Sequence, residues 1–383
     1  MSRNQASVGT VEELHARAAA VTGLNDFGAT DYLEGMRVLL GSFDLEAGLT
    51  QVGQEVARET VQRALVGRLL SESGFAEYPE HADVPIERPI FVTGLPRTGT
   101  TALHRLLGAD PGNQGVEMWL AERPQPRPTP HTWPDNTDFQ QVQANYAAQN
   151  QANPEMMATH YMDAMEVEEC WRLLQQSMLS LSFESIHHVP TYSGWLAEQD
   201  WTDAYRRHKR NLQLIGLNDS DRRWVLKNPS HVFAIDEILR VYPDALIIQT
   251  HRDPRSVIGS VCSLTELAGR GWSTSFDAAT IGRTQLELWS RGMATFSAAR
   301  RKADPAQFFD VEYEDLVRDP VGTVEKVYSH FGLPFSERTR EAVAAVHEQS
   351  MSGARRPSHR YALADFGLSE SEVVAKFADI EHV

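Results

Sequence analysis

The stretch that decides the fold is PIFVTGLPRTGTT, residues 89–101. Its apolar start is typical of a buried parallel strand. Gly94 and Gly99 then bracket a four-residue loop, and Thr100 and Thr101 suit the first turn of a helix with an apolar stripe. A loop of this kind points backbone N–H groups at one place, and the helix N-terminus adds partial positive charge there. The stretch therefore predicts a strand, a tight turn and a helix that together bind an anion, most often a phosphate.

The loop is close to a Walker A phosphate loop, GxxxxGK[ST], but lacks its lysine. Thr100 stands where that lysine would be, and the cation of the loop is Arg97. This departure argues against a P-loop nucleotide kinase or ATPase, which we keep as the first alternative. A non-catalytic nucleotide-binding protein is the second, although the chain offers no repeat or charged tail in its favour. Without the lysine the case for a bound Mg²⁺ also weakens, and we expect no metal.

Composition narrows the class of protein further. The chain has 383 residues, 42% of them hydrophobic, enough for one large α/β domain or two smaller ones. Its formal net charge of -16 argues against a nucleic-acid partner, and it means that an anionic ligand must be held by a local basic cluster. The two cysteines, Cys170 and Cys262, have no metal-ligand spacing. There is no apolar leader and no run near the roughly 18 apolar residues of a membrane span, so we expect a cytoplasmic protein without a transmembrane segment.

The rest of the chain divides by pattern into two expected parts. Residues 1–85 carry apolar residues at helical spacing, which predicts a helical cap packed on the core. Residues 86–383 are expected to form an α/β domain, with a helical lid inserted at about 110–220. The methionines and tryptophans of this insertion favour the binding of an apolar ligand, although such clusters more often form ordinary core. His160, Glu168 and Glu169 lie among them as candidates to face the pocket.

Residues 223–251 predict a strand, a helix and a second strand, an order typical of a parallel sheet. Lys227 ends the first strand, and Ser230 is expected to cap a helix that begins at His231. Loops at the carboxyl ends of such strands converge with the anion loop. Lys227 and His231 are therefore candidates to face the bound anion, with an ordinary surface or packing role as the alternative for each.

Three segments together resemble the PAPS-dependent sulfotransferases, which transfer a sulfuryl group from 3′-phosphoadenosine-5′-phosphosulfate (PAPS) to a hydroxyl or amine. They are GLPRTGTT from Gly94, LKNPSH from Leu226 and HRDPRSVIGS from His251, as in the bacterial branch of that family. The resemblance implies a P-loop-type three-layer fold around a central parallel sheet. It also implies PAPS as the donor, and the acceptor is expected to be a hydrophobic small molecule or lipid.

The resemblance assigns nucleotide contacts to individual residues. The 5′-phosphosulfate is assigned to the loop residues Arg97, Thr98, Gly99, Thr100 and Thr101. The 3′-phosphate is assigned to Arg252 and Ser260, which lie eight residues apart after a strand. Arginine offers a planar fork to phosphate oxygens, and the serine adds a hydroxyl.

Two later segments complete the expected nucleotide site. Tyr313, in the segment YEDL, resembles a tyrosine found beside the nucleotide in this family. Arg355 and Arg356 are expected in a basic loop that closes over the 3′-phosphate, with a merely solvated loop as the alternative.

Catalysis requires a cation at the leaving oxygen and a base at the acceptor. Arg97 and Lys227 are the candidates for stabilising the charge that grows on the leaving phosphate oxygen. A general base must also take the acceptor's proton. His231 is the first candidate, because histidine suits that work near neutral pH. Glu117, which follows the anion helix, is the second.

Overall fold

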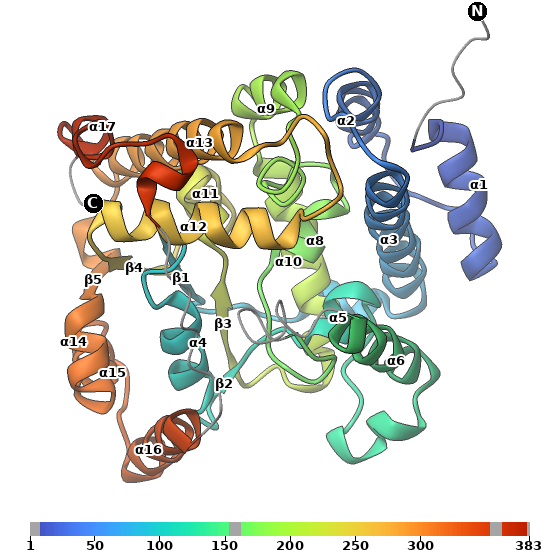
Figure 1. Ribbon diagram of the computed structural model, residues 1–383. Helices are drawn as coiled ribbons and strands as arrows, with labels where there is room; N and C mark the ends of the chain where they lie inside the picture. The colour runs from blue at the N-terminus through green and yellow to red at the C-terminus, as the bar shows by residue number, and fades with distance from the viewer. Residues whose placement is uncertain (1–7, 153–161, 353–361, 381–383) are drawn as a thin grey trace, which may run out of the picture.

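Residues 8–152, 162–352 and 362–380 are described by the computed structural model, whose centre is a sheet of five parallel strands in the order β2–β3–β1–β4–β5 (Figure 1). The strands are β1 (Ile90–Gly94), β2 (Asn113–Gln114), β3 (Arg223–Lys227), β4 (Leu246–His251) and β5 (Phe308–Glu312). The predicted parallel sheet is confirmed. Because β1 is central and later strands lie on both sides of it, its carboxyl end is where open α/β sheets bind ligands.

Helices cover both faces of the sheet, because successive residues of a strand point to opposite faces and here both sets are apolar. Ile90 and Val92 belong to a core shared with α4 (Thr100–Gly108), α15 (Pro320–His330) and α16 (Glu337–Ser352). Phe91 points into the opposite core. That core is covered by α10 (Thr202–Ile215), α11 (Ile235–Val241), α12 (Pro254–Ala268) and α13 (Ala278–Arg300). The predicted three-layer fold is thus confirmed.

The shorter helices connect these layers. Two are α14 (Tyr313–Arg318), directly after β5, and α17 (Glu370–Phe377), which packs on α12 and α13. The 3-10 helices are η1 (Pro79–Asp83), η2 (Pro130–Asp135), η3 (Gly216–Asn218), η4 (Pro229–Phe233), η5 (Pro305–Gln307) and η6 (Leu363–Phe366). In the described ranges, no helix combines the length and apolarity that a membrane crossing requires.

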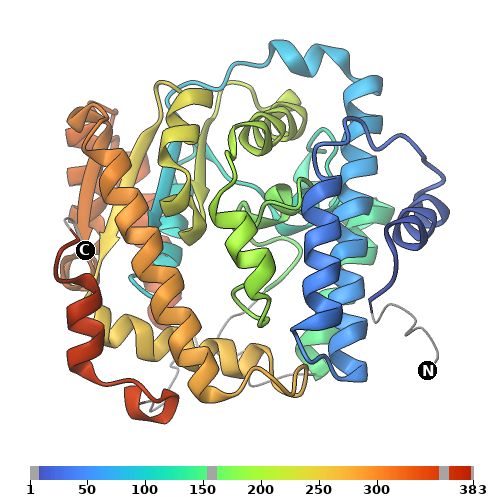
Figure 2. The same cartoon turned by 90° about the horizontal axis from the view of Figure 1, so that it is seen from above.

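The N-terminal region is helical, as predicted. It consists of α1 (Val11–Thr22), α2 (Leu33–Leu45) and α3 (Gln51–Glu77). Thr10 and Glu13 form a capping box at the start of α1. These helices lie at the opposite end of the molecule from β5 and α14 (Figures 1 and 2). Their apolar residues belong to the same continuous core as Phe91; the domain boundary expected after residue 85 stays a prediction.

The connection between α2 and α3 pairs with the connection between α12 and α13, far away in the sequence (Figure 2). The Thr50 hydroxyl donates to the Gly271 carbonyl at 2.7 Å, and the Thr50 N–H donates to the Trp272 carbonyl at 2.9 Å. A Cβ at Gly53 would lie 1.9 Å from that same Trp272 oxygen, so this position requires glycine. The N-terminal helices are therefore attached to the second half of the chain by main-chain contacts.

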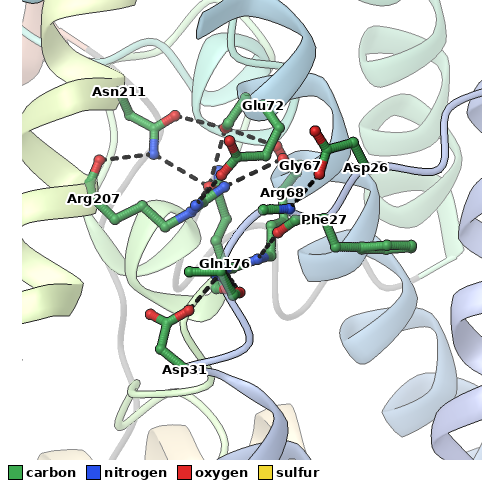
Figure 3. Close-up of polar contacts among 12 residues, drawn as sticks. Asp26, Phe27, Asp31, Gly67, Arg68, Glu72, Gln176, Arg207 and Asn211 are labelled. Carbon is green, nitrogen blue, oxygen red and sulfur yellow. Dashed lines mark hydrogen bonds and ion pairs between the residues drawn. The ribbon is translucent and has the colours of Figure 1, made fainter.

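A buried arginine holds the connection between α1 and α2 in place (Figure 3). The side chain of Arg68 on α3 is 1% exposed and donates to the carbonyls of Phe27 (2.7 Å) and Gln176 (3.0 Å) and to the Asp31 carboxylate (2.8 Å). A second buried arginine, Arg207 on α10, lies nearby and forms an ion pair with Glu72 at 2.6 Å. Burial and the charge of Arg68 lower the pKa of Arg207 to about 10. Buried charge needs such partners, so Arg68 ties three chain segments together.

The insertion between the first and second halves of the sheet is largely helical. It contains α5 (Met118–Glu122), α6 (Thr137–Ala152), α8 (Trp171–Gln175), α9 (Pro190–Ala197) and α10. Its start differs from the prediction, because Asn113 and Gln114 form the edge strand β2 on β3. The limits of the predicted lid, 110–220, therefore include one strand of the sheet.

Candidate active site

The loop after β1 has the backbone of an anion site. Gly94, Arg97 and Gly99 all have positive φ, at 132°, 66° and 92°. A Cβ at Gly94 would lie 2.5 Å from the Thr250 carbonyl, so the close approach of β4 requires glycine there. Gly99 is the N-cap of α4 and has no side chain to accept from the first N–H groups of the helix. Those groups are left to bind an anion.

The threonines of the loop divide between support and ligand contact. Thr98 is completely buried, and its hydroxyl lies 2.5 Å from both the Leu95 carbonyl and the Thr250 hydroxyl. It holds the loop on β4, so its contact with a ligand would come from its N–H. Thr100 is also buried, whereas Thr101 is exposed on the first turn of α4.

The residues expected around the nucleotide meet beside this loop. Arg252 directly follows β4, and Asp253 accepts from the Arg255 N–H to cap α12. The Arg252 Nη1 donates to the Arg97 carbonyl at 3.0 Å, and its guanidinium lies 4.2 Å from the centre of the Tyr313 ring. The Arg97 Nε donates to the Ser260 hydroxyl at 3.3 Å. The structure therefore brings Arg97, Arg252, Ser260 and Tyr313 into one cluster.

Lys227 lies at the end of β3, on the side of β1 opposite to β4, and forms an ion pair with a carboxylate there. Its side chain is 1% exposed, and its Nζ donates to Glu169 Oε1 at 2.5 Å and to Thr101 Oγ1 at 3.2 Å. Glu169 is fixed by the backbone on both sides, where the Glu168 N–H donates to the Val116 carbonyl and the Cys170 N–H to the Lys227 carbonyl. Glu169, with 19% of its side chain exposed, is thus connected to the anion loop through the side chain of Lys227.

No motif of the sequence distinguishes Glu169 from its neighbours. It follows another glutamate in an insertion without a regular pattern, and only the pairing of that insertion with the end of β3 places it here. Glu168 is buried beside it and accepts from the Glu169 N–H at 3.2 Å.

His231 lies in the core behind the sheet. Its ring is completely buried, its Nδ1 is 2.7 Å from the Tyr205 hydroxyl, and it packs edge-on against Phe91. Burial, helped by the nearby charges of His208 and Lys227, holds the pKa of His231 well below its usual range. The ring is thus part of the core, where the Tyr205 hydroxyl is its described hydrogen-bond partner.

The turn that carries His231 also corrects the predicted helix start. Asn228, rather than Ser230, is the capping residue, and its side chain accepts from the Ser230 N–H at 3.1 Å. Pro229 then begins the 3-10 helix η4, and α11 starts only at Ile235. An asparagine before a proline favours such a turn, because its side chain replaces a backbone acceptor and proline disfavours helix at the residue before it.

Glu117 takes part in a separate ion-pair network. Its carboxylate accepts from Arg127 Nε at 3.0 Å, and Arg127, only 4% exposed, also pairs with Asp219. This arrangement gives Glu117 a structural partner and leaves it without a contact to the Lys227 ammonium among the described residues. His160, Arg355 and Arg356 lie outside the described residues. Within the described ranges, no group of three or more His, Cys, Asp or Glu side chains is arranged to hold a metal ion.

The anion loop, the Arg252–Ser260 pair and the lysine at the strand end are the features by which the sequence resembles the sulfotransferases. The chain matches the model of the sulfotransferase family over residues 89–337, well over half of its length. It belongs to the sulfotransferase family, so it is a transferase that moves a sulfuryl group from a donor to an acceptor. The kinase and non-catalytic alternatives are set aside.

Its relatives include mycobacterial sulfotransferases. The structure superposes on that of the sulfotransferase STF1 from Mycobacterium tuberculosis H37Rv with a TM-score of 0.91 and 52% identity, covering 97% of this chain and 99% of that one. For the sulfotransferase STF9 from Mycobacterium avium the TM-score is 0.88 with 26% identity, covering 99% and 96%. The omega-hydroxy-beta-dihydromenaquinone-9 sulfotransferase Stf3 of Mycobacterium bovis is 28% identical over 282 residues, 71% of this chain and 67% of that protein.

Proposed function

We propose that the chain transfers the sulfuryl group of PAPS to a hydroxyl of an apolar, lipid-like acceptor. The observation that carries this proposal is the convergence of Arg97, Lys227 and Arg252, each at or just past a different strand end, on one loop with uncapped helix N–H groups. In a protein with a net charge of -16, three cations gathered at one sheet edge fit a ligand that carries two separate anionic groups.

The two anionic groups of PAPS would be bound by different parts of this cluster. The 5′-phosphosulfate would be held by Arg97 and by the N–H groups of Thr98, Gly99, Thr100 and Thr101. The 3′-phosphate would be held by Arg252 and Ser260, with Tyr313 beside the nucleotide. Arg355 and Arg356 are proposed as further contacts to the 3′-phosphate. We propose no metal ion.

Glu169 is our proposed general base, in preference to His231 and Glu117. It is the carboxylate that touches Lys227 next to the anion loop, whereas His231 is fully buried and Glu117 is bound to Arg127. PAPS, when bound, supplies the sulfuryl group and a phosphate leaving group. Glu169 would accept the proton of the acceptor hydroxyl, and Lys227 would donate a hydrogen bond to the leaving oxygen.

The direct contact between these two residues couples their tasks. While Glu169 is ionised, it holds the Lys227 ammonium at 2.5 Å. When the carboxylate gains a proton, its attraction for the ammonium falls, and Lys227 becomes available to the negative charge that develops on the leaving oxygen. The proton transfer and the charge stabilisation would therefore support each other in the transition state.

The lipid-like acceptor is proposed from the relative whose name states an omega-hydroxy-dihydromenaquinone as substrate. The insertion that carries Glu169 is rich in apolar side chains, and Met178, Leu181 and Phe183 are among those that it contributes to the core. Apolar surroundings with a few polar groups are typical of sites for such molecules.

The test is transfer of labelled sulfate from PAPS to three acceptors: a hydroxylated prenyl quinone, the same quinone without the terminal hydroxyl, and a water-soluble phenol. We expect a labelled product with the hydroxylated quinone only. Equal transfer to the soluble phenol would reject the lipid-like acceptor. Transfer of a labelled phosphoryl group from ATP with Mg²⁺ in a parallel assay, with no sulfuryl transfer from PAPS, would reject the donor.

A further inference from the structure

We infer that Arg252 has a second task beyond holding a phosphate: its guanidinium fixes the backbone of the 5′ loop and so couples the two halves of the nucleotide site. The inference rests on the proposed function, because it concerns how that site is held in shape. Arg252 is a positioning residue in this role, acting through the Arg97 carbonyl.

The backbone of the loop needs such a support. Arg97 has φ 66°, a left-handed conformation that residues other than glycine seldom adopt and that is maintained only where surrounding contacts enforce it. Arg252 Nη1 donates to the carbonyl of this residue at 3.0 Å. The carbonyl belongs to the peptide group that joins Arg97 to Thr98. In a trans peptide the C=O and N–H point in opposite directions, so holding the oxygen on Arg252 also fixes the direction of the Thr98 N–H.

The ring of Tyr313 lies against both Arg252 and the loop. The guanidinium lies 4.2 Å from the ring centre, a distance at which a cation is attracted to the face of an aromatic ring. A Cβ at Gly99 would lie 3.2 Å from Tyr313 Cδ2, so the same ring packs directly on the loop. Gly99, Tyr313, Arg252 and Arg97 therefore form a closed set of contacts between the loop, the end of β4 and the start of α14.

A single guanidinium can serve both halves because it has five N–H donors in a planar fork. The contact with the Arg97 carbonyl uses Nη1, and the same fork can also bind a phosphate oxygen. A 3′-phosphate that orders Arg252 would at once order the loop that holds the 5′ group. The expected consequence is that loss of Arg252 weakens even a nucleotide that has no 3′-phosphate.

The experiment compares two ligands by titration calorimetry: 3′-phosphoadenosine 5′-phosphate, and adenosine 5′-phosphosulfate, which lacks the 3′-phosphate. In Arg252→Ala we expect the affinity for both to fall, by roughly tenfold for adenosine 5′-phosphosulfate, as for the loss of one charge-assisted hydrogen bond. The matched control is Arg255→Ala, which removes the same charge from the same helix start, where Arg255 pairs with Asp253. It should leave both affinities within about twofold.

An Arg252→Ala protein that loses affinity only for the 3′-phosphorylated ligand would overturn the inference and leave the proposed function intact. A wild-type protein that binds neither ligand would instead overturn the proposed function. Should Arg252→Ala fail to fold, the pair Tyr313→Leu and Tyr313→Phe decides. We expect Tyr313→Leu to weaken the binding of adenosine 5′-phosphosulfate severalfold more than Tyr313→Phe, which keeps the ring beneath the guanidinium; an equal loss of affinity in both variants would also overturn the inference.

Discussion

The nucleotide side and the acceptor side of the site are built in different ways. On the nucleotide side, Arg97, Lys227 and Arg252 lie at the end of a strand or within three residues of it, so the register of the sheet places them. On the acceptor side, Glu169 lies more than 50 residues from the nearest strand in either direction and is placed by backbone contacts of an irregular segment. The strand register places the cations, whereas the position of the proposed base depends on the packing of the insertion.

The largest expected effect breaks the acceptor side alone. Glu169→Gln should lower kcat by about 10²- to 10⁴-fold, because the proposed base is lost, while affinity for 3′-phosphoadenosine 5′-phosphate stays within about twofold. Steady-state kinetics and calorimetry measure the two quantities separately. The control is Glu168→Gln, which alters the adjacent buried carboxylate without touching Lys227 and should keep most of the activity. Full activity in Glu169→Gln would return the role of base to His231 or Glu117.

Next in size is a change confined to the nucleotide side. Gly99→Ala places a methyl group 3.0 Å from Leu316 and 3.2 Å from Tyr313 at φ 92°, which should cost roughly 1–3 kcal/mol of stability and weaken nucleotide binding at least tenfold. Urea unfolding and calorimetry give both values. Gly108→Ala, at the other end of α4, meets nothing within 4 Å and should be neutral or stabilise by up to about 1 kcal/mol. If the two variants behaved alike, the tight packing of the loop would not matter.

Acid should weaken the core that supports both sides. Burial lowers the pKa of His104 and His208 to about 3 and that of His187 to about 4, and it lowers that of His231 as well. Because the folded values lie below the unfolded value of 6.5, the unfolded chain binds more protons. Stability from these groups is complete above pH 6.5 and is lost as the pH falls, down to about 4 for His187 and about 3 for His104 and His208.

Each of these histidines should contribute about 1 kcal/mol to the loss of unfolding free energy between pH 7 and 5.5. Urea unfolding at the two pH values measures the loss, and His208→Gln should reduce it by about the share of one group. An unchanged difference in that variant would show that His208 does not titrate in this way.

The smallest effect concerns a surface contact between the two sides. Arg105 on α4 and Glu166 on the insertion form an ion pair at 3.1 Å with about a third of each side chain exposed. Exposed pairs contribute little, so Arg105→Ala should change the unfolding free energy by less than about 1 kcal/mol. A loss of several kcal/mol in urea unfolding would mean that this pair holds the acceptor side in place.

The same difference explains how far the sequence alone could lead. The anion loop, the parallel strands, Arg252, Ser260 and the family follow from short motifs at strand ends. His231 illustrates the limit, because it lies only four residues after Lys227, yet the ammonium contacts Glu169 and Thr101 whereas the imidazole packs on Phe91. The direction of the His231 side chain depends on η4, a turn that sequence periodicity does not reveal. Glu169 could not be chosen over Glu168, because only tertiary contacts distinguish the two.

The pairing of the α2–α3 connection with the α12–α13 connection has a consequence for the synthesis of the protein. Thr50 and Gly271 are separated by 221 residues, which a ribosome adds in about 10–45 s. During that interval the first three helices leave the ribosome without the chain segment against which Thr50 and Gly53 close. The part of the protein that is made first is thus among the last to be completed. A nascent chain arrested before residue 271 should remain sensitive to protease at its N-terminal helices.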